Sequence, residues 1–271
     1  MTRDHTQAEC YVITIDTNPK SIQSAERCIS SAKRFATGQC PLCCESTTSP
    51  DLDINIFSAF TPRHDPLNLL QNKGINTNKL HISNNCSYVD AAAGCFLSHL
   101  TLWEKCIEIN KPIVILEHDA IIKNQIPSNI LDGTGFNFVI NIGKPSYGNV
   151  KIPEFTGINL FTLKHLIGTH AYVVKPDGAY LLIEQAKKDS HRGGGAKAVD
   201  MFLNKKKFPF LQELYPWPVE AEPQFTTIQQ PRNKYQRELI LDEFGKVRTG
   251  VGCADLNLPQ HGFENGFEDL L

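Results

Sequence analysis

The sequence predicts an α/β protein built on a mainly parallel sheet, and three observations carry this prediction. Residues 113–116 are four consecutive branched aliphatic residues, which is typical of a strand buried on both faces of a parallel sheet. The chain opens with a β-branched run at 11–15, which passes through a polar turn into a helical pattern. Further strand and helix patterns alternate to about residue 207, as expected when helices flank a parallel sheet.

The first part of the chain predicts a βαβ unit followed by a short helix. The run at 11–15 is the first strand, and it ends at the polar turn 16–19. Between residues 21 and 35 apolar residues recur every three or four positions, which predicts an amphipathic helix. Alternation at 54–60 predicts the second strand, and a short helix is expected at 67–72.

The middle of the chain has the strongest periodic pattern. Apolar residues fall on one face of a predicted long helix over 89–109, which the segment 110–112, ending in proline, terminates. The buried strand 113–116 follows directly. Further strands are expected at 136–142 and 171–174, where β-branched and aromatic residues gather.

The last predicted elements are helices at 176–188, which opens on Pro-Asp, and at 199–207, which follows a glycine-rich loop. Beyond Phe208 prolines recur and the periodicity weakens, so an irregular region is expected over about 209–271, with its end mobile. We therefore expect a single domain over residues 1–271.

Composition limits the classes of function. A length of 271 residues with 41% hydrophobic content suffices for a sizeable core. The formal charge of -2 gives no global basic field, so no nucleic-acid partner is expected. No run approaches the roughly 20 apolar residues of a transmembrane segment, and the N-terminus has no signal-peptide core. Nine cysteines, an odd number, fit a reducing compartment, so a cytoplasmic protein with free thiols is expected.

Two polar clusters are candidates for metal binding. Glu117, His118 and Asp119 follow the buried strand, at the strand end where α/β sheets bind their ligands. Oxygen ligands there suit a hard divalent cation that bridges to a substrate phosphate, although acids also end strands simply to be solvated. The second cluster, Cys40, Cys43 and Cys44, has the spacing of half a zinc site, or is a plain loop cluster.

The strand and the helix before it resemble a known family. Gly94-Cys95-x-x-Ser98-His99-x-x-x-Trp103, followed after a spacer by the strand that ends at Asp119, is similar to the signature of glycosyltransferase family 25, the lipooligosaccharide and procollagen galactosyltransferase group. There the strand ends in an E-D-D triplet. The resemblance spans roughly residues 10–230. Further matches in the same order are Arg27, the segments 168–174 and 178–182, and Val199-Asp200.

The resemblance implies a GT-A fold, a Rossmann-like sheet that binds a nucleotide sugar and a divalent metal. The implied reaction moves a hexose, most simply galactose from UDP-galactose, onto a glycan or hydroxylated acceptor with inversion, as in lipopolysaccharide biosynthesis. A cation would neutralise charge on the leaving diphosphate. Asp119 is the first expected metal ligand, with Glu117 as second ligand or ribose contact. His118 departs from the E-D-D pattern: it either ligates the metal, which favours Mn2+ over Mg2+, or points away from it.

The resemblance and the pattern also suggest the remaining site residues. Inversion needs a base for the acceptor hydroxyl, and Asp200 is the candidate, although the helix dipole alone would explain an Asp at a helix start. Asp16 and Asn18 lie where a nucleotide base or ribose would sit. Arg27 could contact a donor phosphate or be a solvated helix residue. Ser98 and His99 could contact the donor or be packed helix residues.

Other readings remain open. With His118 in the triplet, the chain is alternatively a catalytically inactive GT-A-like domain that binds sugar or protein. A metal-dependent phosphate-ester hydrolase is a second rival. His170 has no assigned role, and the run 205–207 of three lysines either attracts an anionic acceptor or is a solvated face.

Overall fold

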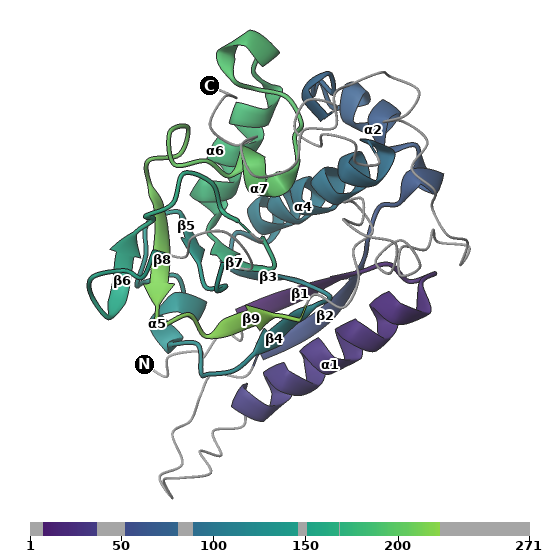
Figure 1. The fold of residues 1–271 in the computed structure, drawn as a ribbon. Helices are drawn as coiled ribbons and strands as arrows, with labels where there is room; N and C mark the ends of the chain where they lie inside the picture. Colours follow the sequence, from purple (N-terminus) through teal and green to yellow (C-terminus); the bar gives the residue numbers. More distant parts are fainter. Residues whose placement is uncertain (1–7, 37–51, 81–88, 146–150, 168, 223–271) are drawn as a thin grey trace, which may run out of the picture.

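The computed structural model describes residues 8–36, 52–80, 89–145, 151–167 and 169–222. Within them a seven-stranded sheet runs in the order β2-β1-β3-β7-β5-β8-β6, and β4 pairs with β9 in a separate two-stranded sheet (Figure 1). The strands are β1 (Ala8–Thr14), β2 (Leu52–Ser58), β3 (Ile113–Glu117), β4 (Ala120–Ile122), β5 (Val139–Asn141), β6 (Gly157–Leu160), β7 (Ala171–Val174), β8 (Leu211–Tyr215) and β9 (Val219–Ala221). The helices are α1 (Pro19–Ala36), α2 (Pro66–Asn72), α4 (Val89–Ile109), α5 (Ser128–Leu131), α6 (Pro176–Lys187) and α7 (Val199–Phe202), with 3-10 turns at Pro62–His64 and Ser190–Arg192.

The sheet is mainly parallel. β1 pairs in parallel with β2 and β3, and β5 pairs in parallel with β8. β7 is antiparallel to both β3 and β5, so β5 points the same way as β3, and only β7 and β6 run in reverse among the seven. The predicted α/β, Rossmann-like sheet flanked by helices is therefore confirmed, although the sequence did not predict the reversed β7.

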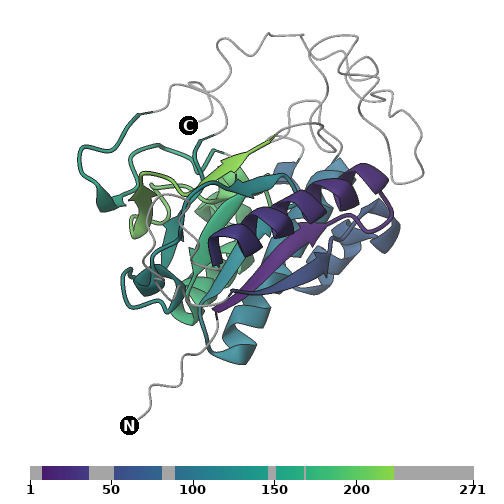
Figure 2. The ribbon, with the colours of Figure 1, turned by 90° about the horizontal axis from the view of Figure 1, so that it is seen from below.

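The strands separate two hydrophobic cores. In β3, Ile113 and Ile115 pack on the α4 and α6 side, whereas Val114 and Leu116 pack on the α1 side. This alternation is the period of two that a strand imposes. Figure 2 shows α1 lying along β1 and β2 on one face of the sheet. The small buried residues of α1 allow close packing there. A strand covered on both faces accounts for the continuous aliphatic run at 113–116.

Several element bounds agree with expectation, and two predictions are wrong. The long helix is found at Val89–Ile109 and the strand at Ala171–Val174. The helix expected to reach residue 207 ends at Phe202; two residues later the Asn204 side chain accepts the Lys206 N–H in a turn that replaces helical bonding.

The larger error is the prediction of an irregular region from about residue 209. This region contains β8, which lies between β5 and β6, and β9. Prolines flank these strands at 209, 216 and 218 and do not interrupt them, so the loss of periodicity did not mean a loss of structure. Residues 223–271 lie outside the described part, so the single-domain expectation stays a prediction.

None of the helices described here is long and apolar enough to cross a membrane.

Candidate active site

The predicted acidic cluster lies at the carboxyl edge of the sheet. Glu117, the last residue of β3, pairs in register with Ile13 near the end of β1. Because β7 is antiparallel to β3, the residues just before β7 come to the same edge, and the Glu117 N–H donates to the His170 carbonyl at 2.9 Å. The edge thus joins strand ends of β1 and β3 to the strand start of β7.

The N-terminal half of α4 docks against this edge through its glycine and serine. A Cβ at Gly94 would collide with the Phe60 carbonyl oxygen, so only glycine lets the helix approach the segment after β2 this closely. Ser98 accepts the Phe60 N–H at 2.9 Å and donates to the Gly94 carbonyl at 2.8 Å. Ser98 is fully buried, so these bonds occupy the hydroxyl that sequence assigned to donor contact or packing.

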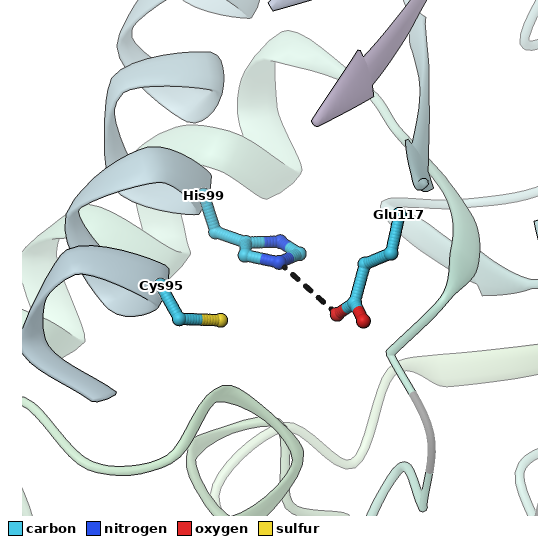
Figure 3. A group of neighbouring side chains, drawn as sticks. All are labelled: Cys95, His99 and Glu117. Atoms are coloured by element: carbon cyan, nitrogen blue, oxygen red, sulfur yellow. Dashed lines mark ion pairs between the residues drawn. The ribbon is translucent and has the colours of Figure 1, made fainter. Parts of the chain in front are cut away.

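The docked helix aims His99 at Glu117. The His99 Nδ1 lies 2.8 Å from the Tyr172 hydroxyl, which also accepts the Trp103 indole N–H at 2.8 Å. All three side chains are buried. These bonds fix the imidazole, and its Nε2 faces Glu117 Oε1 at 3.4 Å (Figure 3).

The Glu117 carboxylate is held through one oxygen. Thr169 donates its hydroxyl to Oε1 at 2.7 Å, and His99 faces the same oxygen. Both contacts fall on Oε1, and the side chain keeps 29% of its surface exposed, so Oε2 can meet a ligand. Burial alone would raise the pKa of Glu117, but His99, the Thr169 hydroxyl and the His170 charge outweigh it and lower the pKa to about 2. Glu117 is therefore ionised at neutral pH.

Asp200 belongs to another element near the same region, the short helix α7. It is the second residue of α7, which packs on α4 through the Phe202 ring, 5.1 Å from that of Phe96 and 5.7 Å from that of Trp103 between centroids. Burial, and then the charges of Glu117 and Asp200, raise the pKa of the Cys95 thiol. Two carboxylates from separate elements thus lie near enough to Cys95 to affect its thiol. The Asp200 Oδ1 also accepts the Met201 N–H at 2.8 Å.

His118 and Asp119 lie differently from Glu117. The His118 ring donates to the Ile13 carbonyl, and burial lowers its pKa. Asp119 has a buried Oδ1 for which the described residues supply no hydrogen-bond partner. Burial and then the Glu117 charge raise the pKa of Asp119 to about 7. In the part of the chain described, the compact trio of possible metal ligands is Cys95, His99 and Glu117, not the consecutive triplet.

The residues predicted to bind the sugar donor lie just after β1 and in the helix α1 that follows. Asp16 accepts the Ser58 hydroxyl at 2.9 Å and is otherwise exposed. Asn18 is buried, and its Oδ1 accepts the Lys20 and Ser21 N–H groups at 3.0 and 3.3 Å, so it caps α1. The structure therefore gives Asn18 a capping role, while a donor contact stays a prediction.

Arg27 lies two turns into α1, away from the carboxyl edge at which α1 begins. Its Nη2 donates to the Ser24 hydroxyl at 3.0 Å, within the same helix. A phosphate contact of Arg27 stays a prediction. Among the three lysines at 205–207, the first two are exposed as a solvated face would be, but Lys207 is half-buried and donates to the Gly193 carbonyl at 2.6 Å.

Sequence reasoning missed Thr169, Tyr172 and Cys95 as site residues. The first two stand in the segment 168–174, where their types gave no sign that an antiparallel strand brings them to His99 and Glu117. Cys95 stands next to Gly94 in the helix motif, and a partly buried helical cysteine is ordinarily core. The cluster of Cys40, Cys43 and Cys44 lies outside the described residues.

A protein-family model matches most of the chain. The profile of a family described as Glycosyltransferase family 25 (LPS biosynthesis protein) matches residues 8–203, from β1 through α7. No curated protein matches the chain.

Proposed function

The chain belongs to glycosyltransferase family 25 and is a transferase of that family with a GT-A-like fold, and from this we propose that it transfers a hexose from a nucleotide sugar, most simply galactose from UDP-galactose, with inversion. One observation carries the proposal. Glu117, at the end of β3 and at the carboxyl edge of the sheet, and Asp200, at the start of α7, are both near enough to Cys95 on α4 for their charges to raise its pKa, and α7 packs on α4. Ligands of open α/β sheets bind at this edge.

Two separated carboxylates suit an inverting transfer. One must serve the donor side, where negative charge develops on the leaving diphosphate, and the other must take the proton from the attacking hydroxyl. Thr169 and His99 hold the Glu117 carboxylate in place. A group that acts on the donor side must be fixed in this way by its neighbours. Asp200 lies on a short helix after a glycine-bearing loop, and we assign it the role of base toward the acceptor.

The residues fit a divalent cation. Asp119 has a buried carboxylate oxygen that the described residues leave without a hydrogen-bond partner, and the Thr169 and His99 contacts of Glu117 both fall on Oε1, not on Oε2. Hard-cation sites use such oxygens together with substrate phosphates. We propose that Asp119 and Glu117 hold Mn2+ or a similar ion, which when bound acts as a Lewis acid toward the diphosphate. His118, turned to Ile13, supports the site from outside it.

The nucleotide would lie over the ends of β1 and β2, where Asp16 and Ser58 face each other. The family description supports a lipopolysaccharide or similar glycan as acceptor. A cytoplasmic location is supported by the free thiols of Cys10, Cys28, Cys95 and Cys106, which fit a reducing compartment.

The proposal is tested by a thermal-shift screen of nucleotide sugars with and without Mn2+. A ligand that binds only the folded state raises the melting temperature, so UDP-galactose with Mn2+ should raise it more than either alone. Simple phosphate esters serve as the hydrolase control, and should not raise it.

The same screen is then run on Asp119→Ala, with the exposed Asp189→Ala as matched control. Asp119→Ala should lose the Mn2+-dependent part of the shift and the transfer of labelled galactose, whereas Asp189→Ala should retain both. Donor binding without any transfer or donor hydrolysis would instead support the catalytically inactive sugar-binding domain. No shift with any nucleotide sugar would refute the proposal.

A further inference from the structure

The side chains of Cys95, His99 and Glu117 form a compact cluster of unlike ligand types. The Cys95 Sγ, a His99 ring nitrogen and a Glu117 carboxylate oxygen all lie within 4.8 Å of one another. Cys95 and His99 are one turn apart on α4, so they share a face, and Glu117 comes to them from the end of β3 (Figure 3). Two rigid elements therefore bring the three groups together.

The His99 Nε2 gives an independent sign that a ligand belongs here. His99 is fully buried, and this nitrogen has no hydrogen-bond partner among the described residues. It faces Glu117 Oε1 at 3.4 Å, a contact that is an ion pair only when the ring is protonated. A buried polar atom is normally satisfied, so an atom left in this state and aimed into a cluster of ligand atoms needs an explanation.

The separation of 3.4 Å between His99 Nε2 and Glu117 Oε1 matches that of two ligand atoms in a tetrahedral metal site. Zinc binds imidazole nitrogen at about 2.0–2.1 Å and carboxylate oxygen at about 2.0–2.2 Å, and at the tetrahedral angle these bonds place the two ligand atoms roughly 3.4 Å apart. The distance is too long for a strong hydrogen bond. We propose that Cys95, His99 and Glu117 form a binding site for a soft transition ion, Zn2+ or its equivalent.

The ligand types select that class of ion. Thiolate and imidazole prefer zinc over Mn2+ or Mg2+, which prefer oxygen. Three protein ligands leave a fourth position for water or another ligand, as in zinc sites that are not purely structural. The second contact of a zinc-bound imidazole is usually made by its other nitrogen, and here His99 Nδ1 meets Tyr172. Binding would release the thiol proton of Cys95 and any proton on Nε2 to solvent.

The site is distinct from the proposed pair of Asp119 and Glu117, but it shares Glu117. Zinc bound by Cys95 and His99 would withdraw the Glu117 carboxylate from the donor side, so Zn2+ should antagonise the Mn2+-dependent reaction. The binding itself does not depend on the proposed transferase activity.

Cobalt spectroscopy on the full-length protein tests the binding directly. Co2+ replaces Zn2+ in such sites, and a thiolate ligand produces a near-ultraviolet charge-transfer band that oxygen and nitrogen ligands do not. The wild type should show this band, saturating at about one equivalent of metal, and Zn2+ should displace it. Cys95→Ala should lose the band, and its affinity for Zn2+ should fall by more than about 100-fold, since even losing an outer-shell partner costs about 10–100-fold.

Two controls keep the result specific. Cys106→Ala removes another free cysteine of the same helix and should keep the band. A variant with Cys40, Cys43 and Cys44 replaced by Ser should also keep it, and melting curves must show that each variant is folded. A band that persists in Cys95→Ala, or that disappears with the 40/43/44 cluster, would overturn the site. Loss of transfer without loss of the cobalt band would count only against the proposed function.

Discussion

The Tyr172 hydroxyl lies 2.8 Å from His99 Nδ1, and so connects the antiparallel strand β7 to the helix α4 that faces the site. The same hydroxyl accepts the Trp103 indole N–H. One buried oxygen therefore holds two motif residues of α4, and through His99 it sets the position of a ring that faces Glu117. The histidine and the tryptophan of the α4 motif thus bind the same hydroxyl, which gives both residues a structural role.

Tyr172→Phe should lower the free energy of unfolding by about 1–3 kcal/mol, because the Trp103 N–H and His99 Nδ1 would remain buried without their partner. The rate of sugar transfer should fall as well, since the His99 ring would no longer be fixed opposite Glu117. Urea unfolding and a transfer assay measure the two effects. The exposed Tyr180→Phe is the matched control, with a change expected within about 0.5 kcal/mol. Equal stability of the two variants would contradict the role of the hydroxyl.

Gly94→Ala should destabilise the protein although alanine favours a helix by about 1 kcal/mol, because the new methyl would meet the Phe60 carbonyl. We expect a net loss of at least about 1 kcal/mol in urea unfolding. Gly178→Ala in α6 is the companion, since its methyl would meet the Phe138 carbonyl in the same way, in a helix that supplies none of the site residues. Both variants should be less stable, but only Gly94→Ala should also weaken the nucleotide-sugar thermal shift.

Much of the fold followed from local patterns, and the exceptions have physical causes. The long helix at Val89–Ile109 and the buried strand β3 were predictable because a strong period or an unbroken aliphatic run sets each of them. β8 was not predictable, since its Glu213 looks like a surface residue. In the structure Glu213 is buried and accepts hydrogen bonds from Thr162 and Trp217, partners that only the tertiary fold supplies.

The site was predictable in its residue types but not in its grouping. Glu117 was expected from its position after a buried strand, and Asp200 from the family resemblance. That His99 meets Glu117 depends on the antiparallel pairing of β7 with β3, which brings Thr169 to Glu117 and Tyr172 to His99. A contact of His99 with the donor stays a prediction. Strand direction is a long-range property, and no local pattern in the segment 168–174 indicates it.

Lys207 should make stability depend on pH. Burial, and then the charges of Lys197 and Lys79, lower the pKa of Lys207 to about 7, so between pH 7 and about 10.5 the unfolded chain binds more protons there than the folded one. This contribution to stability is therefore greatest above about pH 10 and is lost as the pH falls to 7.

Lys207→Met keeps most of the apolar stem and removes the titrating group. The rise in stability from pH 7 to pH 9.5, measured by urea unfolding, should be smaller in this variant than in the wild type. The exposed Lys205→Met is the matched control and should follow the wild-type curve. Parallel curves for Lys207→Met and the wild type would show that Lys207 titrates like a surface lysine.

Asp200→Asn should lower kcat by about 100-fold or more while the thermal shift with nucleotide sugar remains, because a general base contributes about 10²–10⁴-fold to rate and does not hold the donor. Asp177→Asn is a close control, since Asp177 is also the second residue of its helix and is exposed. Both substitutions remove the same favourable interaction with a helix N-terminus, worth about 0.3–1 kcal/mol, so the two variants should lose similar stability. The loss of rate should appear in Asp200→Asn alone. If the two variants differ in stability but not in rate, Asp200 serves the fold, and the base must be sought elsewhere around Cys95.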